Sequence, residues 1–320
     1  MNSTVRSTDA ISTPLRISDM VAPRRIPPDS GWRSMVYRLS SGTINLGESP
    51  SEKRYRELRD RIRRHIRKHH VITVLSGKGG VGKTTLTACI GGIFSECRSE
   101  NVVAIDAVPG FGTLAGRIDE NPPGDYAAVL SDADIQGYAD IREYLGQNGV
   151  GLDVLAGNRS SDQPRPLDPP MFDGVLSRLR RTHSISVVDT ADDLEHPSMK
   201  AVLDSSDTLV FISGLTADTS LPVTRGIDLL RSMGYHDLVS RSMVILNNTR
   251  STDSGEARRY LIERFRQSGA TVEYMPYDEH LSDGGIIDTR RYLSKQARLR
   301  LFEITAALAD KYLPDSDRTR

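Results

Sequence analysis

A stretch rich in glycine and lysine near residue 80 combines the residue types that bind nucleotide phosphates. It reads Gly77, Lys78, Gly79, Gly80, Val81, Gly82, Lys83, Thr84 and Thr85. Glycines allow positive φ angles and close approach of the backbone, so successive N–H groups can converge on phosphate oxygens. Lys83 would supply a positive charge to the β- and γ-phosphates, and the Thr84 hydroxyl would bind Mg²⁺. This pattern favours a nucleotide site over a glycine turn without a ligand.

The segments on either side of the loop are those that a phosphate site requires. Residues 71–76 form an apolar run that enters the loop directly, and a helical pattern starts at Leu86. A helix that begins at the loop directs the positive end of its dipole toward bound phosphate. Strand, glycine loop and helix N-terminus together match the context of a Walker A motif.

Beyond residue 71 the chain alternates between short apolar runs and longer amphipathic segments. The expected strands are 71–76, 102–107, 152–155, 185–189, 208–213, 243–247 and 271–275; expected helices include 222–232, 256–267 and 291–313. Strands that are apolar on both faces predict the α/β fold class, with a doubly wound, mostly parallel sheet and helices on both faces. Ligands of such sheets bind at the carboxyl ends of the strands. Four polar residues are expected there: Lys83, Asp106, Asp189 and Asn247.

The second residue of the loop points to a known family. The run from Lys78 to Thr85 resembles the deviant Walker A loop of the MinD/ParA ATPases, and the resemblance extends over residues 71–313. It implies a P-loop ATPase that binds ATP and Mg²⁺ and forms an ATP-dependent homodimer around its nucleotides. In this family the extra lysine, here Lys78, reaches the phosphates bound by the partner. A solvated lysine on a loop is the alternative.

The same resemblance assigns catalytic and metal-binding roles to two aspartates. Segment 103–107 is similar to the family's second strand, whose acidic end, here Asp106, leads into switch I. Segment 186–190 is similar to the Walker B strand, so Asp189 would hold a Mg²⁺-bound water. A simple capping role for an aspartate at a strand end is the alternative reading of Asp189.

The resemblance also implies an adenine site. Asn247 ends a strand similar to the one whose asparagine reads adenine, and a carboxamide offers both a donor and an acceptor to that base. Asn248 follows directly, so the assignment could shift by one residue, and a turn role for Asn247 is a further alternative. Pro276 and Asp278 match the loop that flanks the adenine.

Two positions depart from the family pattern and place hydrolysis in doubt. Switch I of the family has a second aspartate that positions the attacking water, and Val108 stands there instead. Asp193 replaces a switch II glycine whose N–H senses the γ-phosphate. We therefore expect nucleotide binding to persist and hydrolysis to be slow, unless Asp192 or Asp193 supplies the missing carboxylate.

The terminal regions resemble a narrower group. Segment 42–50, Trp32 and the segment 276–285 look like those of the MinD-like ATPases encoded with actinobacterial type VII (ESX) secretion systems. This implies type VII secretion components as partners, at the inner face of the cell membrane. The C-terminus is polar and contains Pro314, which argues against the amphipathic membrane-targeting helix with which MinD ends.

The composition is that of an ordinary globular protein. The 42 Lys and Arg balance 42 Asp and Glu, no apolar run is long enough to span a membrane, and no signal peptide is visible, so we expect a cytoplasmic protein. The expected domains are a largely disordered tail over 1–50 with a short docking segment near Trp32, a basic amphipathic helix over 51–70, the ATPase domain over 71–313 and a polar tail over 314–320. The 51–70 helix has nine basic and three acidic residues. It either packs on the domain or binds an acidic surface of protein, anionic lipid or DNA.

The favoured function is an ATP-binding dimerisation switch that serves a type VII secretion apparatus, with slow conversion of ATP to ADP and phosphate. The alternatives are a ParA-like partition ATPase that binds DNA without sequence preference, and a pseudo-ATPase that binds nucleotide and acts as a scaffold.

Overall fold

The structure is a computed structural model of the 320-residue chain. It describes residues 26–28, 31–41, 43–109, 112–157, 167–251 and 255–312. The first 25 residues of the expected N-terminal tail and the C-terminal tail 314–320 lie outside these ranges. The chain divides into two compact units, Met1–Arg56 and Glu57–Arg320.

The first unit contains a short helix, α2 (Gly31–Leu39), in the segment around Trp32. The Trp32 side chain is 65% exposed. Farther along, Ser49 N donates to Glu52 Oε2 (2.7 Å) and Glu52 N donates to Ser49 Oγ (3.2 Å). These reciprocal hydrogen bonds form a capping box that begins α3 (Pro50–Ile62), which continues into the second unit.

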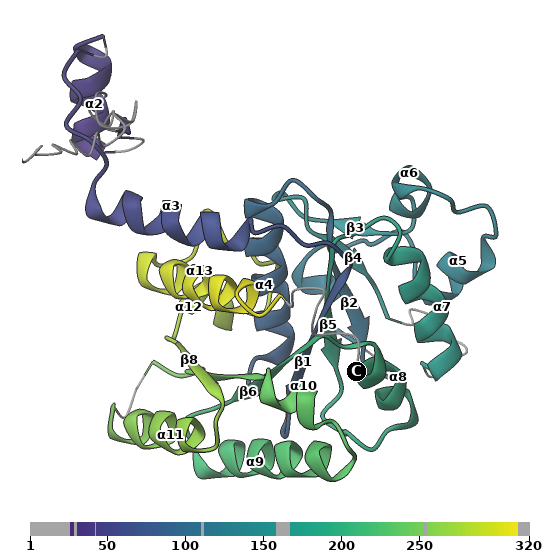
Figure 1. Ribbon diagram of the computed structural model, residues 1–320. Helices are drawn as coiled ribbons and strands as arrows, with labels where there is room; N and C mark the ends of the chain where they lie inside the picture. The colour runs from purple at the N-terminus through teal and green to yellow at the C-terminus, as the bar shows by residue number, and fades with distance from the viewer. Residues whose placement is uncertain are drawn as a thin grey trace, which may run out of the picture. The chain divides into compact units, whose positions relative to one another are not determined.

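The second unit is built on an eight-stranded sheet in the order β3-β4-β2-β5-β1-β6-β7-β8 (Figure 1). Its strands are β1 (His70–Ser76), β2 (Val102–Ala107), β3 (Gly146–Gln147), β4 (Asp153–Leu155), β5 (Ile185–Thr190), β6 (Thr208–Ser213), β7 (Met243–Asn247) and β8 (Thr271–Met275). All neighbouring strands are parallel except β3 and β4. The α/β class and the mostly parallel sheet are confirmed. The two-residue β3 is too short to show any pattern in the sequence.

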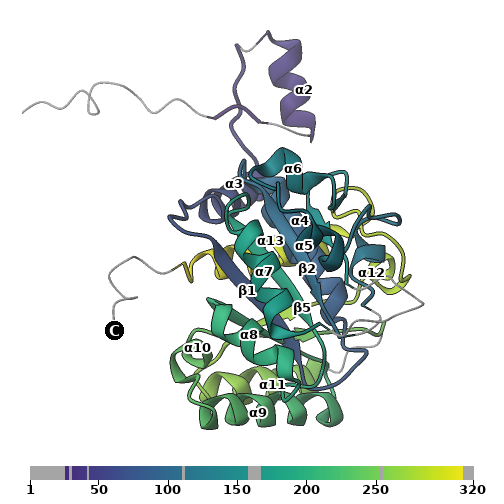
Figure 2. The same cartoon turned by 90° about the vertical axis from the view of Figure 1, so that its right-hand side faces the viewer.

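Helices cover both faces of the sheet, as a doubly wound fold requires. One face carries α4 (Lys83–Cys97) and α13 (Lys295–Ala309). The larger core lies on the other face, beneath α5 (Tyr126–Ser131), α6 (Tyr138–Arg142), α7 (Pro169–Leu179), α8 (Pro197–Ser205), α9 (Ala217–Ser232), α10 (His236–Ser240) and α11 (Gly255–Gln267). Figure 2 shows α7 and α8 in front of β1 and β5. Two short helices complete the unit, η1 (Ala115–Arg117) and α12 (Glu279–Ser282).

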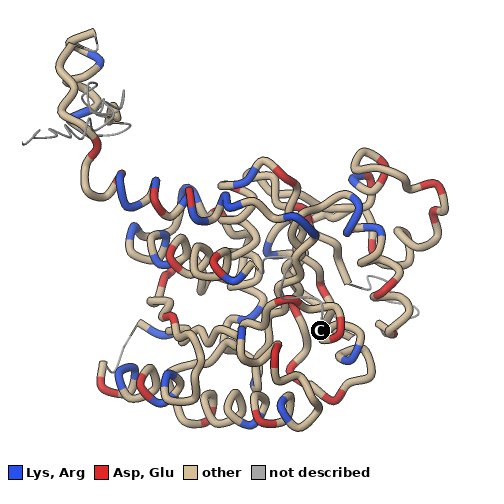
Figure 3. Tube along the Cα trace, viewed as in Figure 1, with Lys and Arg blue, Asp and Glu red and all other residues tan. Residues whose placement is uncertain are grey.

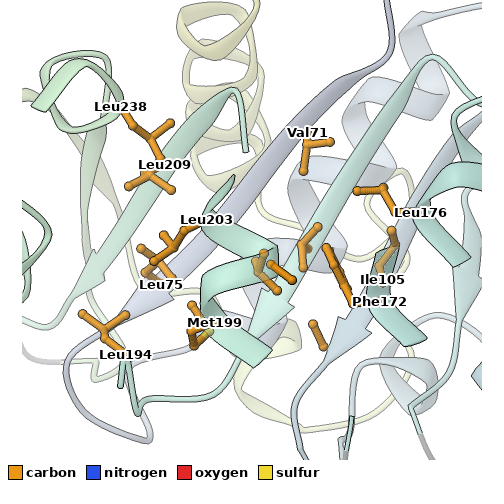
Figure 4. Packing of buried hydrophobic residues seen from close by; sticks show 14 of the residues in the cluster. Val71, Leu75, Ile105, Phe172, Leu176, Leu194, Met199, Leu203, Leu209 and Leu238 are labelled. Carbon is orange, nitrogen blue, oxygen red and sulfur yellow. The ribbon is translucent and has the colours of Figure 1, made fainter. Parts of the chain in front are cut away.

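Strand residues divide between the two layers by alternation. Val71 and Leu75 of β1 belong to the larger core, where Phe172 of α7 and Met199 and Leu203 of α8 pack (Figure 4). Every residue of β1 is buried, so the strand needs apolar cover on both sides. This is why the sequence shows continuous apolar runs instead of alternation.

The basic helix expected over 51–70 ends at Ile62, so its last turns were predicted wrongly. The Arg98 guanidinium donates through Nη1 to the carbonyl oxygens of Ile62 (2.7 Å) and Arg64 (2.9 Å). These carbonyls would otherwise accept from the next helical turn, so the side chain of Arg98 replaces that turn. The chain then enters β1 at His70.

Two other helices begin at residues other than those expected. α9 starts at Ala217, so Pro222 lies inside the helix and does not open it. Pro222 packs so closely on the first glycine of the loop that a Cβ on Gly77 would overlap it. α13 starts at Lys295, where Ser294 Oγ accepts from Ala297 N (3.2 Å) and caps the helix. Within the described ranges, no helix has the length and apolar character that crossing a bilayer demands.

Candidate functional site

The phosphate loop connects the carboxyl end of β1 to the N-terminus of α4, as the sequence predicts. Gly80 and Gly82 have φ angles of +78° and +87°, the left-handed region that disfavours residues with a Cβ. A Cβ at Gly82 would also overlap the Nδ2 of Asn247. Asn247 donates a hydrogen bond from Nδ2 to the Val81 carbonyl (2.8 Å). The loop therefore needs its glycines, and the end of β7 helps to hold it.

A cavity of about 390 Å³ lies over this loop. It is lined by residues 78–85 of the loop and by Ser76, Val108, Gly112, Thr113, Thr190, Ala191 and Asp192. Its volume falls within the range of small-molecule sites in proteins. Asp192 is the one carboxylate among the lining residues that the structure describes.

Lys83 lies at the base of the cavity with its side chain 11% exposed. Its Nζ donates to the Thr190 carbonyl at the end of β5. The same atom lies 3.6 Å from Asp189 Oδ1 and 3.7 Å from Asp192 Oδ1. The ammonium group is thus oriented by oxygen atoms of β5 and of the loop that follows it, which suits a cation that receives phosphate oxygens.

Thr84 and Asp189 are brought together by the first turn of α4 and the end of β5. The Thr84 hydroxyl donates to Asp189 Oδ2 (2.6 Å), and the Asp189 side chain is fully buried. Burial raises the pKa of Asp189 above its ordinary value, although Lys83 and Thr84 act against that rise. Hydroxyl and carboxylate oxygens are the donors that Mg²⁺ prefers, so these two residues fit a magnesium site.

Asp106 stands directly opposite Asp189 on the adjacent strand β2. Its carboxylate accepts hydrogen bonds from Val108 N (3.2 Å) and Leu114 N (3.1 Å), and it is only 1% exposed. Burial, and then the charge of Asp189, raise the pKa of Asp106 to about 7. A Cβ on Gly112 would overlap this carboxylate. Asp106 therefore holds the loop that follows β2 and does not line the cavity.

Of the two residues that depart from the family pattern, Val108 lines the larger cavity and Asp193 does not. Val108 lines the cavity with an isopropyl group where the resemblance leads us to expect a carboxylate. Asp192 also lines it, and its Oδ1 accepts from the Ser76 hydroxyl (2.7 Å). Asp193 is not among the lining residues, and its Oδ1 accepts from Glu195 N (2.9 Å) within its own loop.

A second, smaller cavity of about 60 Å³ adjoins the first at Gly82 and Thr85, which line both. It is lined by Gly82, Thr85, Leu86, Asn247, Asn248, Thr249, Pro276, Tyr277, Asp278, Leu281 and Ser282. The structure thus brings together the three residues expected at an adenine site, Asn247, Pro276 and Asp278, and also places Asn248, the alternative to Asn247, in the lining. Asp278 also accepts from Ser294 N (2.9 Å), which ties this side of the site to the start of α13.

Lys78 lies at the open rim of the larger cavity, and its side chain is 49% exposed. Its Nζ donates to Asp218 Oδ2 (2.6 Å) in the first turn of α9. This hydrogen bond, followed by one from Thr216, lowers the pKa of Asp218 to about 2. The lysine is therefore neither buried nor directed at its own phosphate loop.

Basic residues lie along α3, as Figure 3 shows, and those from Arg59 onward make contacts within the second unit. Arg59 lies 3.8 Å from Glu96, and Arg61 and Arg64 both pair with Asp310. Arg63 Nε donates to the Cys97 carbonyl at the end of α4 (2.6 Å). The apolar side, Leu58 and Ile62, is completely buried. These contacts support the packing role for this segment.

One buried residue beside the site had no signal in the sequence. Arg117 Nη2 donates to Thr85 Oγ1 (3.1 Å) and to the Leu281 carbonyl (2.9 Å). It occupies no position of the Walker motifs, and only the fold brings it next to the loop.

A glycine loop between a parallel strand and a helix, with a lysine and a threonine on one cavity and a strand-end aspartate hydrogen-bonded to that threonine, defines a P-loop nucleotide-binding domain. The family model of the CobQ/CobB/MinD/ParA nucleotide binding domain matches residues 72–285, about two thirds of the chain. This protein belongs to that family.

Individual relatives agree with this assignment. The chain is 32% identical to the ESX-1 secretion-associated protein EspI of Mycobacterium tuberculosis over 290 residues, which make up 90% of this chain and 43% of EspI. It therefore spans less than half the length of this curated relative.

Solved structures show the same fold. The septum site-determining protein MinD of Pyrococcus horikoshii, complexed with Mg-ADP, has a TM-score of 0.58 at 20% identity and covers 77% of this chain and 99% of its own. A ParA family ATPase of Chlorobium tepidum has a TM-score of 0.58 at 17% identity, over 76% of this chain and 98% of its own.

Proposed function

We propose that this protein is an ATP-dependent switch that binds Mg-ATP at the phosphate loop and dimerises around the bound nucleotide. The observation that carries the proposal is that Lys83 and Thr84 line the larger cavity and that both contact Asp189, which is buried beneath them. The solved MinD relative that shares the fold is complexed with Mg-ADP. Thr84 and Asp189 would hold Mg²⁺, which would neutralise phosphate charge.

The smaller cavity is the proposed site for adenine. It joins the phosphate cavity at Gly82 and Thr85, so one nucleotide can occupy both. The Nδ2 of Asn247 is already bonded to the Val81 carbonyl, which leaves its Oδ1 for the base. Asn248 Oδ1 accepts from Arg250 N (3.2 Å), and Asn248 lines the same cavity. Both asparagines are therefore candidates for contact with the base.

Lys78 is the proposed dimer contact. Two triphosphates brought face to face concentrate negative charge, which a lysine from each protomer can neutralise. The exposed position of Lys78 at the cavity rim supports this role, because the side chain can leave Asp218 without any buried group being uncovered.

Hydrolysis is proposed to be slow. The isopropyl group of Val108 can neither orient nor deprotonate water, and both Asp106 oxygens accept backbone hydrogen bonds. Asp106 is thus proposed to position the switch I loop. A pseudo-ATPase scaffold is the second candidate function, and the apolar Val108 is the observation that favours it.

The relationship to EspI supports service to a type VII secretion apparatus, with the chain on the cytoplasmic side and recruited by secretion components. The partition alternative, with DNA as partner, is less well supported, because Arg59, Arg61 and Arg63 make contacts within the second unit.

Titration calorimetry with Mg-ATP, followed by light scattering, tests the proposal. Wild type should bind, and Lys83→Ala should lose binding because it removes the cation from the base of the cavity. Lys200→Ala is the matched control: its side chain is 74% exposed and pairs with Asp204 on α8. Equal affinity in wild type and Lys83→Ala would contradict the loop assignment, and a monomer at saturating ATP would contradict the switch.

A further inference from the structure

The Arg117 guanidinium is buried behind the junction of the two cavities. The residue is 7% exposed, and its Nη2 donates to Thr85 Oγ1 and to the Leu281 carbonyl. Thr85 lines both cavities, and Leu281 lines the smaller one. Arg117 therefore links the start of α4 to α12, at the point where the phosphate cavity and the proposed adenine cavity meet.

The charge of this guanidinium is incompletely compensated. Its Nε and Nη1 are buried without a hydrogen-bond partner among the described residues. No carboxylate in the described part of the chain lies within salt-bridge distance, and burial lowers the pKa of Arg117 below its ordinary value, although the more distant charge of Asp283 acts against that fall. A buried cation without an adjacent anion is strongly unfavourable, so an anionic ligand bound nearby would be favoured.

The hydrogen bond from Arg117 also decides what the Thr85 hydroxyl can do. A hydroxyl has one proton to donate and accepts through its lone pairs. Because Arg117 donates to Oγ1, the guanidinium occupies an acceptor position on that oxygen, and the hydroxyl proton remains available to the cavity side. A phosphate oxygen can accept this proton, and it is negatively charged. Hydrogen bonds to a charged acceptor are about twice as strong as hydrogen bonds between neutral groups.

We propose that Arg117 is a positioning residue for the nucleotide. It fixes the Thr85 hydroxyl as a donor to the phosphate nearest the sugar, and it holds the Leu281 carbonyl, and with it α12, against α4. This inference rests on the proposed function, that is, on a nucleotide at the phosphate loop. Since the phosphate concerned is present in both ADP and ATP, both nucleotides depend on Arg117 equally.

The test is the affinity for Mg-ATP and Mg-ADP of wild type, Arg117→Ala, Thr85→Val and the double variant. Arg117→Ala should lower the affinity for both nucleotides by a similar factor of about ten or more, the effect of losing a hydrogen bond that involves a charged group. Thr85→Val, which keeps the side-chain shape, should lower both affinities by a comparable factor. The double variant should bind nucleotide no more weakly than Arg117→Ala, because removal of Arg117 already removes the hydrogen bond that fixes the Thr85 hydroxyl. Arg117→Lys should recover part of the affinity, because it restores the charge without the fork geometry.

Arg98→Ala is the matched control. Arg98 is also 7% exposed and donates to backbone carbonyls, but it lies at the opposite end of α4. The Arg98→Ala variant should have a lower thermal unfolding temperature than wild type and the same nucleotide affinity. Unchanged affinity in Arg117→Ala, or losses that multiply in the double variant, would overturn the inference while the proposed function stands. A wild type without nucleotide affinity would overturn both.

Discussion

The Nζ of Lys78 lies 2.6 Å from the Oδ2 of Asp218, so the loop lysine is held by an aspartate of its own protomer. Both side chains are exposed, at 49% and 62%, and their contact is therefore screened by solvent. A lysine that serves a dimer must break this contact when the partner arrives.

This competition predicts opposite effects for the two residues. Asp218→Asn should strengthen ATP-dependent dimerisation about two- to fivefold, the scale of an exposed ion pair. Lys78→Ala should bind ATP and remain monomeric. Light scattering across a concentration series with ATP measures both. Weaker dimerisation in Asp218→Asn would show that the aspartate itself belongs to the interface.

A second prediction concerns the missing carboxylate of switch I. A carboxylate that orients or deprotonates water typically contributes about 10²–10⁴-fold to a rate. Val108→Asp should therefore raise single-turnover hydrolysis at least about tenfold, a cautious part of that range. The rate of phosphate release from wild type, Val108→Asp and Asp192→Ala shows which of the two positions, 108 or 192, acts on the attacking water. A loss in Asp192→Ala alone would identify Asp192 as the carboxylate that acts on water, whereas fast turnover unaffected by either change would exclude both positions.

The third prediction follows from the raised pKa of Asp106. In the folded protein this pKa is about 7, against an ordinary value of 3.8. Between these values the folded state holds a proton that the unfolded state has lost, so stability falls as pH rises from about 4 to 7. At 1.36 kcal/mol per pKa unit, the contribution is at most about 4 kcal/mol.

Urea unfolding at several pH values checks this slope. Asp106→Asn should remove it, so the variant gains stability relative to wild type between pH 5 and pH 7.5. Parallel pH profiles of wild type and variant would show that Asp106 is ionised throughout this range.

The fourth prediction concerns the basic segment after α3. Arg63→Glu should reduce the free energy of unfolding by roughly 1–3 kcal/mol, because the Cys97 carbonyl loses its donor and gains a negative neighbour. Nucleotide affinity should be unchanged. Binding to a polyanion such as heparin at low salt should differ little between wild type and the variant. A steep loss of salt-dependent binding in Arg63→Glu, without a change in stability, would restore the acidic-partner role.

The sequence alone was sufficient for the phosphate loop and the sheet. The loop from Gly77 to Thr85 is contiguous, and its glycine requirement comes from local backbone geometry, so spacing reveals it. The buried parallel strands can also be recognised in the sequence, because a strand covered on both faces requires an unbroken apolar run. The placement of Asp189 and Asn247 near the loop follows once the strands are known to be parallel, since their carboxyl ends share one edge.

Only the tertiary structure decided what each polar group at that edge contacts. Asp106 lies near the end of β2 and Asp192 just after β5, yet Asp106 is buried beneath the loop that follows β2 and Asp192 lines the cavity. Arg117 lies 32 residues from Thr85 and 164 from Leu281, and no local pattern links them. The early end of α3 depends in the same way on Arg98, a residue from another helix end. Hydrogen bonds of this kind join segments that are distant in the chain, so they exist only after the sheet has brought those segments together.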